Sequence, residues 1–191
     1  MFALKNKYFL IIESIKDIDL SNIKNLNKFI IIYTNKKKKE NINNLLKFRR
    51  FCRVKKIDFY VSNDVKLASI LKADGLYISA YNKNLNLIKI NFNHFKIIGS
   101  AHNIKEINIK NLQGCSQIIF SRLFKTSYKY KKGSLGVIKF NLFKLLRKES
   151  LIPLGGINLS NLNKLKLVQS DGFAMMSEIR KNPHKILSRL F

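Results

Sequence analysis

Two loops near the end of the chain carry residues suited to binding an anion. Gly155 and Gly156 end the apolar run LIPL, and a second run, GFAMM, ends in Met176 and Ser177. A glycine turn leaves backbone N–H groups open to an anion, because no side chain blocks its approach. If the two runs are neighbouring parallel strands, both loops lie where barrel enzymes often bind phosphate. The pattern therefore predicts a phosphate site; a tight strand-to-helix turn without a ligand is the alternative.

The elements that must position these loops follow from hydrophobic periodicity. Short apolar runs alternate with helix-like segments along the whole chain, and no Asn-Gly or similar hairpin signal joins them. The predicted strands are 8–12, 28–33, 58–61, 75–79, 96–100, 117–121, 151–154 and 173–176. The predicted helices are 40–56, 64–72, 104–112, 140–148, 160–168 and a last one that ends near residue 190.

Alternating strands and helices without hairpins predict parallel strands joined by right-handed crossovers. We expect an α/β fold, a compact (β/α)8 TIM barrel that forms a single domain over residues 1–191, with an open doubly wound sheet as the alternative. A weak recurrence favours the barrel, since a turn and then a strand precede each of Ser79, Ser121 and Ser177. These serines should lie on the rim where the strands end, which is where barrel enzymes keep their active sites.

The charge of the chain is its most unusual bulk property, at +26 with 37 lysines and arginines. The basic residues are scattered along the chain among asparagine and isoleucine, and the only dense run is 36–39. We find no zinc-finger spacing, no RNP-type aromatic motif and no basic heptad helix. We therefore expect no specific nucleic-acid partner, although weak, salt-sensitive binding follows from charge alone.

Hydropathy and cysteine usage predict a cytoplasmic location. No apolar run reaches the roughly 18 residues that a membrane span needs. The first residues are interrupted by lysine and carry no small-residue cleavage site, so a secretory signal is not expected. Cys52 and Cys115 lack metal-ligand or redox spacing, and we expect both to be buried and reduced.

Several motifs, in order along the chain, resemble those of thiamine phosphate synthases and the related TenI-type proteins. The resemblance covers about residues 28–185 and rests on four segments: DVKLASILKADGLYIS, IIGSAHNIKEI, IIFSRLFKTSYKYKKGSLG, and PLGGIN followed by SDGFAMMSEI. It implies a (β/α)8 barrel that joins an aminopyrimidine methyl diphosphate to a thiazole phosphate. Diphosphate leaves with the help of Mg²⁺, so the implied partners are small phosphorylated substrates.

The same resemblance implies roles for eight residues. Catalytic roles fall on Lys129 in the loop after the sixth strand and on Ser100 at the end of the fifth. Substrate-binding roles fall on Gly155, Gly156, Met176, Ser177, Thr126 and Lys36. His102, beside Ser100, is expected to be a structural histidine, and 37–39 a solvated run.

The chain departs from the family's pattern at the metal site. Asn63 and Asn82 occupy the two positions where the family has metal-binding acids, after the third and fourth strands. An asparagine offers Mg²⁺ a neutral carbonyl oxygen, so the loss of two negative charges should greatly weaken the site. We expect Asp64 to cap the following helix and Asp74 to stabilise a turn, with a metal role as the alternative for each.

Three functions remain open from the sequence. The first is a divergent thiamine phosphate synthase, in which surplus lysines partly replace the charge of magnesium. The second is a TenI-like thiazole tautomerase, which requires a histidine where this chain has Arg122. The third is a non-catalytic barrel that binds a phosphorylated ligand.

Overall fold

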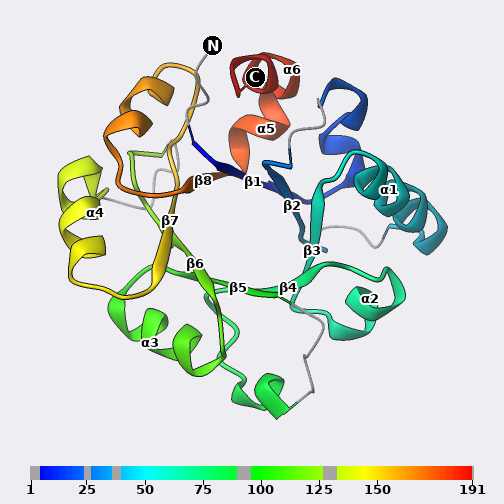
Figure 1. Cartoon of the computed structure of the whole chain (residues 1–191), viewed down its shortest axis with the longest axis horizontal. Coiled ribbons are helices and arrows are strands. Elements are labelled where there is room, and N and C mark those ends of the chain that lie inside the picture. The colour runs from blue at the N-terminus through cyan, green and yellow to red at the C-terminus, as the bar shows by residue number, and fades with distance from the viewer. Residues whose placement is uncertain (1–4, 24–26, 36–39, 90–95, 127–132, 191) are drawn as a thin grey trace.

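The computed structural model describes residues 5–23, 27–35, 40–89, 96–126 and 133–190. Within these residues, eight parallel strands close into a barrel in chain order, with β8 paired to β1 (Figure 1). The closed sheet confirms the predicted (β/α)8 barrel over the open sheet. The strands are β1 (Lys7–Ile12), β2 (Phe29–Tyr33), β3 (Asp58–Ser62), β4 (Gly75–Ile78), β5 (Lys96–Ala101), β6 (Gln117–Ser121), β7 (Ser150–Leu154) and β8 (Gly172–Met175).

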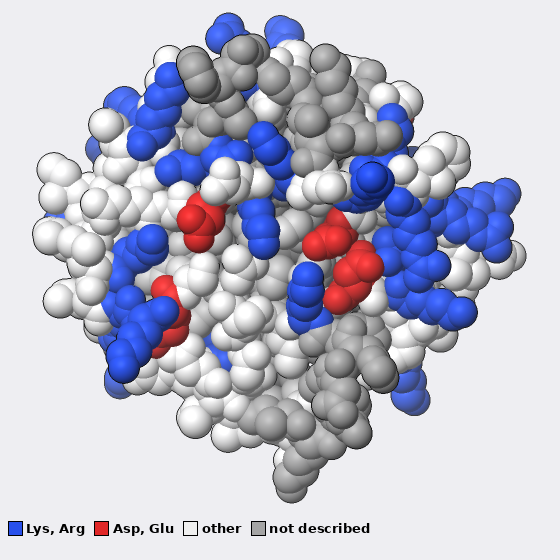
Figure 2. Space-filling model, viewed as in Figure 1, with Lys and Arg blue, Asp and Glu red and all other residues white. Residues whose placement is uncertain are grey.

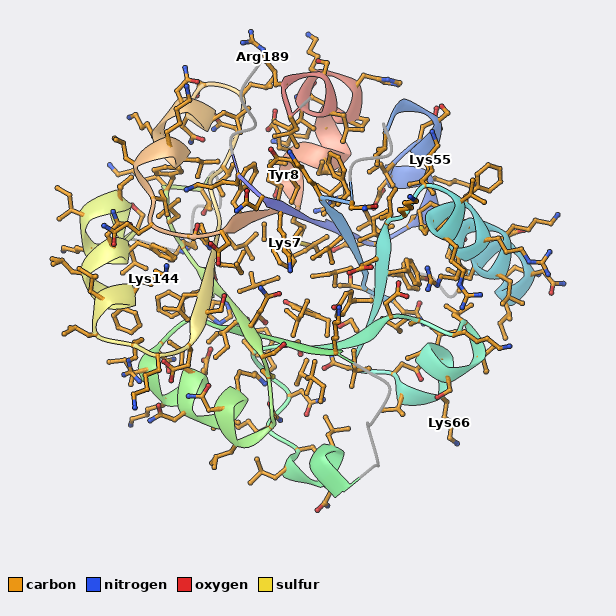
Figure 3. The ribbon with its side chains drawn as sticks, viewed as in Figure 1. Lys7, Tyr8, Lys55, Lys66, Lys144 and Arg189 are labelled. Atoms are coloured by element: carbon orange, nitrogen blue, oxygen red, sulfur yellow. The ribbon has the colours of Figure 1, made fainter. Side chains whose placement is uncertain are left out.

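The strands read as continuous apolar runs because both of their faces are buried. Alternate side chains fill the inside of the barrel, and the others pack outward under the helices. In Figure 3, Lys7 lies towards the middle of the barrel and Tyr8, the next residue, lies on the other side of β1. The inner layer consists of Phe9, Ile11, Ile30, Ile32, Tyr60, Tyr77, Ile98, Ile119, Ile152 and Ala174.

Helices surround the barrel, and asparagine or aspartate caps several of them. Asn41, Asp64 and Asn103 accept hydrogen bonds from backbone N–H groups in the first turns of α1, α2 and α3, which confirms the predicted cap at Asp64. Asp74 instead pairs with the buried Arg49 at 2.6 Å and accepts the N–H of Phe59. The helices are α1 (Ile42–Val54), α2 (Val65–Ile70), α3 (Ile104–Leu112), α4 (Gly136–Leu145), α5 (Ser177–Lys181) and α6 (Pro183–Leu190).

Three of the connections carry only 3₁₀ turns in their described residues. They are η1 (Ile15–Asp17) and η2 (Leu20–Asn22) between β1 and β2, η3 (Leu85–Lys89) between β4 and β5, and η4 (Leu162–Leu167) between β7 and β8. The α-helix predicted at 160–168 is therefore wrong, because the segment winds as 3₁₀. Short connections of this kind explain how 191 residues close a barrel that usually takes about 250.

Charge and thiols are distributed much as the sequence predicts. On the face shown in Figure 2, lysine and arginine side chains lie near the centre as well as around the edge, with the largest group over α1. Cys52 is buried and Cys115 half-buried; both are free thiols, and burial raises the pKa of each to about 12. Among the described residues, no helix is long and apolar enough to cross a membrane.

Candidate active site

A cavity of about 390 Å³ opens where β6, β7 and β8 end, on the carboxyl-terminal rim of the barrel. Four residues predicted from the glycine and strand-end pattern line it together: Gly155, Gly156, Met176 and Ser177. Three cationic side chains, Arg122, Lys125 and Lys181, and one acid, Glu178, also contribute to its wall. The surplus of positive charge suits an anionic ligand.

The glycine turn after β7 is held against the loop after β6. Leu123 N–H donates to Leu154 O, and Phe124 N–H donates to Gly155 O, both at 2.9 Å. Gly155 and Gly156 have φ angles of 102° and 68°, and a Cβ on Gly156 would lie 2.3 Å from Lys125 O. Glycine is thus required by the backbone conformation and by this close approach. The sequence had suggested a different reason, namely access for the anion.

The other loop of the cavity begins at the end of β8. Met176 precedes Ser177, which is the first residue of α5. The buried Ile179 and an ion pair between Arg180 and Glu13 attach α5 to the barrel next to β1. These contacts fix the side of the cavity formed by Met176 and Ser177.

Thr126 lines the same cavity, within the loop after β6. Its Oγ1 accepts a hydrogen bond of 3.5 Å from Nη1 of Arg122, so the cation lies beside the hydroxyl. Two further predicted residues, Lys36 and Lys129, lie outside the described residues, so their roles stay predictions.

Ser100 lies near the end of β5 and is only 8% exposed. It forms a hydrogen bond with Tyr77, a member of the inner layer of the barrel. Burial raises the pKa of the Tyr77 phenol, which the hydrogen bond with Ser100 only partly opposes. The structure therefore places Ser100 at the mouth of the barrel interior and not in the wall of the 390 Å³ cavity.

Asn63 and Asn82 meet at the ends of β3 and β4. Nδ2 of Asn82 donates to Oδ1 of Asn63 at 3.1 Å, and the same oxygen accepts the N–H of Ser79 at 3.0 Å. Asn63 has a φ of 57°, a left-handed conformation that asparagine tolerates better than most residues. Among the described residues, no three histidine, cysteine or acidic side chains lie together in an arrangement that could hold a metal ion.

A second cavity, of about 540 Å³, lies between the loops after β4, β5 and β6. His102 and Glu106 line it, with 2.9 Å between Nδ1 of the histidine and Oε2 of the carboxylate. This side-chain contact fits the expected structural role of His102. Burial raises the pKa of Glu106, but its hydrogen bonds with His102 and the charge of His102 outweigh that effect and lower it. Arg122 lines both cavities and so lies between them.

Sequence reasoning missed the cations of the first cavity. Lys125 and Lys181 come from different loops and are only two of 37 basic residues, so nothing in the sequence distinguishes them. Arg122 was noted only as the residue that replaces a histidine. Its place between two cavities depends on the three-dimensional arrangement of the rim.

The fold and the first cavity define a (β/α)8 barrel with a cavity on its carboxyl-terminal rim that three cationic side chains line. The family model described as thiamine monophosphate synthase matches residues 22–179, and the chain belongs to this family. The match extends over both the β3–β4 end of the rim and the β6–β8 cavity.

Relatives and solved structures agree with this membership. The chain is similar to the thiamine-phosphate synthases of Pelagibacter ubique (29% identity, 86% of this chain and 81% of the relative) and Clostridioides difficile (28%, 75% and 69%). It is 30% identical to that of Prochlorococcus marinus over 63% of its length, but spans only about a third (35%) of that relative. A thiamine phosphate pyrophosphorylase from Pyrococcus furiosus has the same fold, with a TM-score of 0.70 and 17% identity over 97% of both chains.

Proposed function

We propose that this chain is a thiamine-phosphate synthase, a transferase that joins aminopyrimidine methyl diphosphate to thiazole phosphate. The lone pair of the thiazole nitrogen forms a bond to the pyrimidine methylene carbon. The carbon–oxygen bond to the diphosphate breaks, and diphosphate leaves with that electron pair. No proton has to move, so the reaction needs no nucleophile or strong base from the protein.

The observation that carries this proposal is the cationic cavity between β6, β7 and β8 in a member of this family. Gly155, Gly156, Met176 and Ser177 form its walls, and Arg122, Lys125 and Lys181 supply positive charge. A phosphate monoester bound there would place its thiazole towards the centre of the rim. The cations then bind the phosphate while the ring nitrogen remains free to react.

Positive charge must also stabilise the leaving diphosphate. Arg122 lies between the two cavities and can attract an anion from either side. Thr126 beside it offers a hydroxyl. The resemblance adds Lys36 as a contact to the diphosphate and Lys129 as part of a loop that contacts phosphate groups. Ser100 and Tyr77, which are hydrogen-bonded at the mouth of the barrel interior, would orient the aminopyrimidine.

The family implies Mg²⁺ on the diphosphate, and the residues of this chain do not fit a resident metal. The two family positions for acids carry Asn63 and Asn82, whose amide groups hydrogen-bond to each other. No step is therefore assigned to a protein-bound metal. Any Mg²⁺ in the reaction would arrive with the diphosphate substrate.

The experiment that tests the proposal is a mass-spectrometric assay for thiamine phosphate. Purified full-length chain is incubated with both substrates, with and without Mg²⁺, beside the variants Lys129→Ala and Ser177→Asp. Product that requires the wild-type chain and falls at least tenfold in both variants supports the synthase. If no product forms under either condition, the proposal is wrong and a non-catalytic barrel that binds a phosphorylated ligand becomes the better description.

A further inference from the structure

The ends of β3 and β4 are joined by the side chain of Asn63. Its Oδ1 accepts hydrogen bonds from Ser79 N–H and from Asn82 Nδ2, and its Nδ2 donates to Ser79 Oγ at 3.1 Å and to Ser62 Oγ at 3.2 Å. A side-chain amide has two donors and one oxygen with two lone pairs, so all four positions are used. The fixed backbone donor of Ser79 determines which amide atom is the oxygen.

Asn82, the other half of the pair, is similarly occupied. Its Oδ1 accepts the N–H of Asn84 at 3.0 Å. Its backbone oxygen accepts Nζ of Lys110 at 2.7 Å and Nε2 of Gln113 at 3.1 Å. Each oxygen of Asn82 is therefore already an acceptor within the protein.

Lys110 brings a positive charge to this site from the outer layer of the barrel. The side chain is fully buried and crosses β5 at Gly99, where a Cβ would lie 2.8 Å from Lys110 Cδ. Its Nζ also donates to Oε1 of Gln113 at 2.7 Å. Burial lowers the pKa of this amine, in spite of the nearby Cys115 and Glu106, which raise it.

We propose that this network, Asn63–Asn82 with Lys110 beneath it, replaces a divalent cation as the connection between β3 and β4. The inference rests on the proposed function, because that function is why a metal would be sought here. Mg²⁺ gives up its waters reluctantly, and proteins usually hold it with one or two carboxylates together with substrate phosphates. This site offers it neutral amides whose oxygens are already occupied, and the amine of Lys110 donates to the backbone oxygen of Asn82.

The test uses Mn²⁺ alone as the probe, titrated into the full-length chain while the signal of free Mn²⁺ is followed by electron paramagnetic resonance. The double variant Asn63→Asp/Asn82→Asp restores acids at both positions and should bind Mn²⁺ at least tenfold more tightly than wild type. The matched control is Asn43→Asp/Asn108→Asp, which adds the same charge on two exposed, separate helices. We expect this control to bind Mn²⁺ as wild type does.

Two results would overturn the inference. One is Mn²⁺ binding by wild type that disappears in Asn63→Ala/Asn82→Ala, which would show that the amides hold a metal. The other is equal binding by the acid variant and its charge-matched control. If the double acid variant does not fold, as judged by circular dichroism, the single variant Asn82→Asp is compared with Asn108→Asp in the same way.

The Mn²⁺ titration and the thiamine phosphate assay can fail independently of each other. Thiamine phosphate production by wild type together with tight Mn²⁺ binding at the asparagines would contradict only this inference. Absence of product together with Mn²⁺ binding confined to the acid variant would contradict only the synthase.

Discussion

The two sides of the carboxyl-terminal rim differ in how they use their polar residues. The β6–β8 side, which we call the open side, encloses a cavity whose wall combines the Gly155–Gly156 turn with three cationic side chains. The β3–β4 side, the closed side, joins Asn63 to Asn82 and to Ser79 by hydrogen bonds. The open side lines a cavity with cations and a glycine turn, whereas the closed side uses its amide groups in hydrogen bonds within the protein.

The difference shows how one barrel can change half of its site and keep the other. Cations on the open side still suit a phosphate, and that requirement does not depend on the closed side. On the closed side, two neutral amides stand at the positions of two charged acids, and one hydrogen bond joins them directly. Four predictions test this contrast, from the largest expected effect to the smallest.

The largest effect is expected at the glycine turn of the open side. Gly156→Ala should lower the free energy of unfolding by about 3 kcal/mol or more, because it combines a positive φ with a Cβ 2.3 Å from Lys125 O. Gly114→Ala is the control: its φ is 72°, but nothing lies within 4 Å of the added Cβ, so it should cost only about 1 kcal/mol. Urea unfolding measures both. Equal losses would show that the contact with the loop after β6 is unimportant.

The next effect concerns the charge of the open side. Ser177→Asp places a negative charge in the wall of the cavity and should raise the KM for thiazole phosphate about tenfold or more, equivalent to about 1.4 kcal/mol. Ser188→Asp adds the same charge at an exposed position of α6 and should leave KM unchanged. Steady-state kinetics at constant ionic strength compares them. An unchanged KM in the Ser177 variant would remove this loop from the phosphate site.

The third prediction concerns α1, which packs against β3 behind the closed side. Burial raises the pKa of the Cys52 thiol to about 12, so the folded state keeps a proton that the unfolded state loses above its ordinary pKa of about 8.5. The contribution of this thiol to the free energy of unfolding is therefore fully present below pH about 8.5 and is lost as the pH rises towards 12. Relative to Cys52→Ala, wild type should lose about 1 kcal/mol between pH about 8.5 and 9.5. A constant difference in unfolding free energy over this range would contradict the buried thiol.

The smallest effect should appear at Asn63. Alanine is usually the more stabilising replacement of the two, but at this position glycine should be. Both Asn63→Ala and Asn63→Gly lose the amide hydrogen bonds of the closed side. Glycine accepts the φ of 57° freely, so the glycine variant should be more stable than the alanine variant by about 0.5 to 1 kcal/mol. Thermal unfolding at one pH would detect this difference. An alanine variant as stable as the glycine variant would mean that the left-handed backbone relaxes.

Apolar runs in the sequence were enough to predict the barrel, because a strand that is buried on both faces consists almost entirely of apolar residues. The sequence predicted an α-helix at 160–168 because leucines recur every three residues, at Leu159, Leu162 and Leu165. This spacing suits a 3₁₀ turn as well as one face of an α-helix. The loops of the open side could be placed together from strand order alone. The contact between Asn63 and Asn82 could not, because it depends on strand register and on the backbone at one residue.

The 3₁₀ connection between β4 and β5 should fluctuate locally while the barrel stays closed. Lys110 and Gln113 attach it at the backbone oxygens of Asn82 and Asn84, with no helical ladder over those residues. Within the described part of this connection, breaking these bonds and the one between Asn82 and Asn63 frees residues 82–84 without separating any pair of strands. Amide hydrogens there should therefore exchange with solvent through local fluctuations, long before the strand amides that need global unfolding. Hydrogen bonds between strands run continuously around the barrel, but the protection of amide hydrogens from exchange should differ from one part of the ring to another.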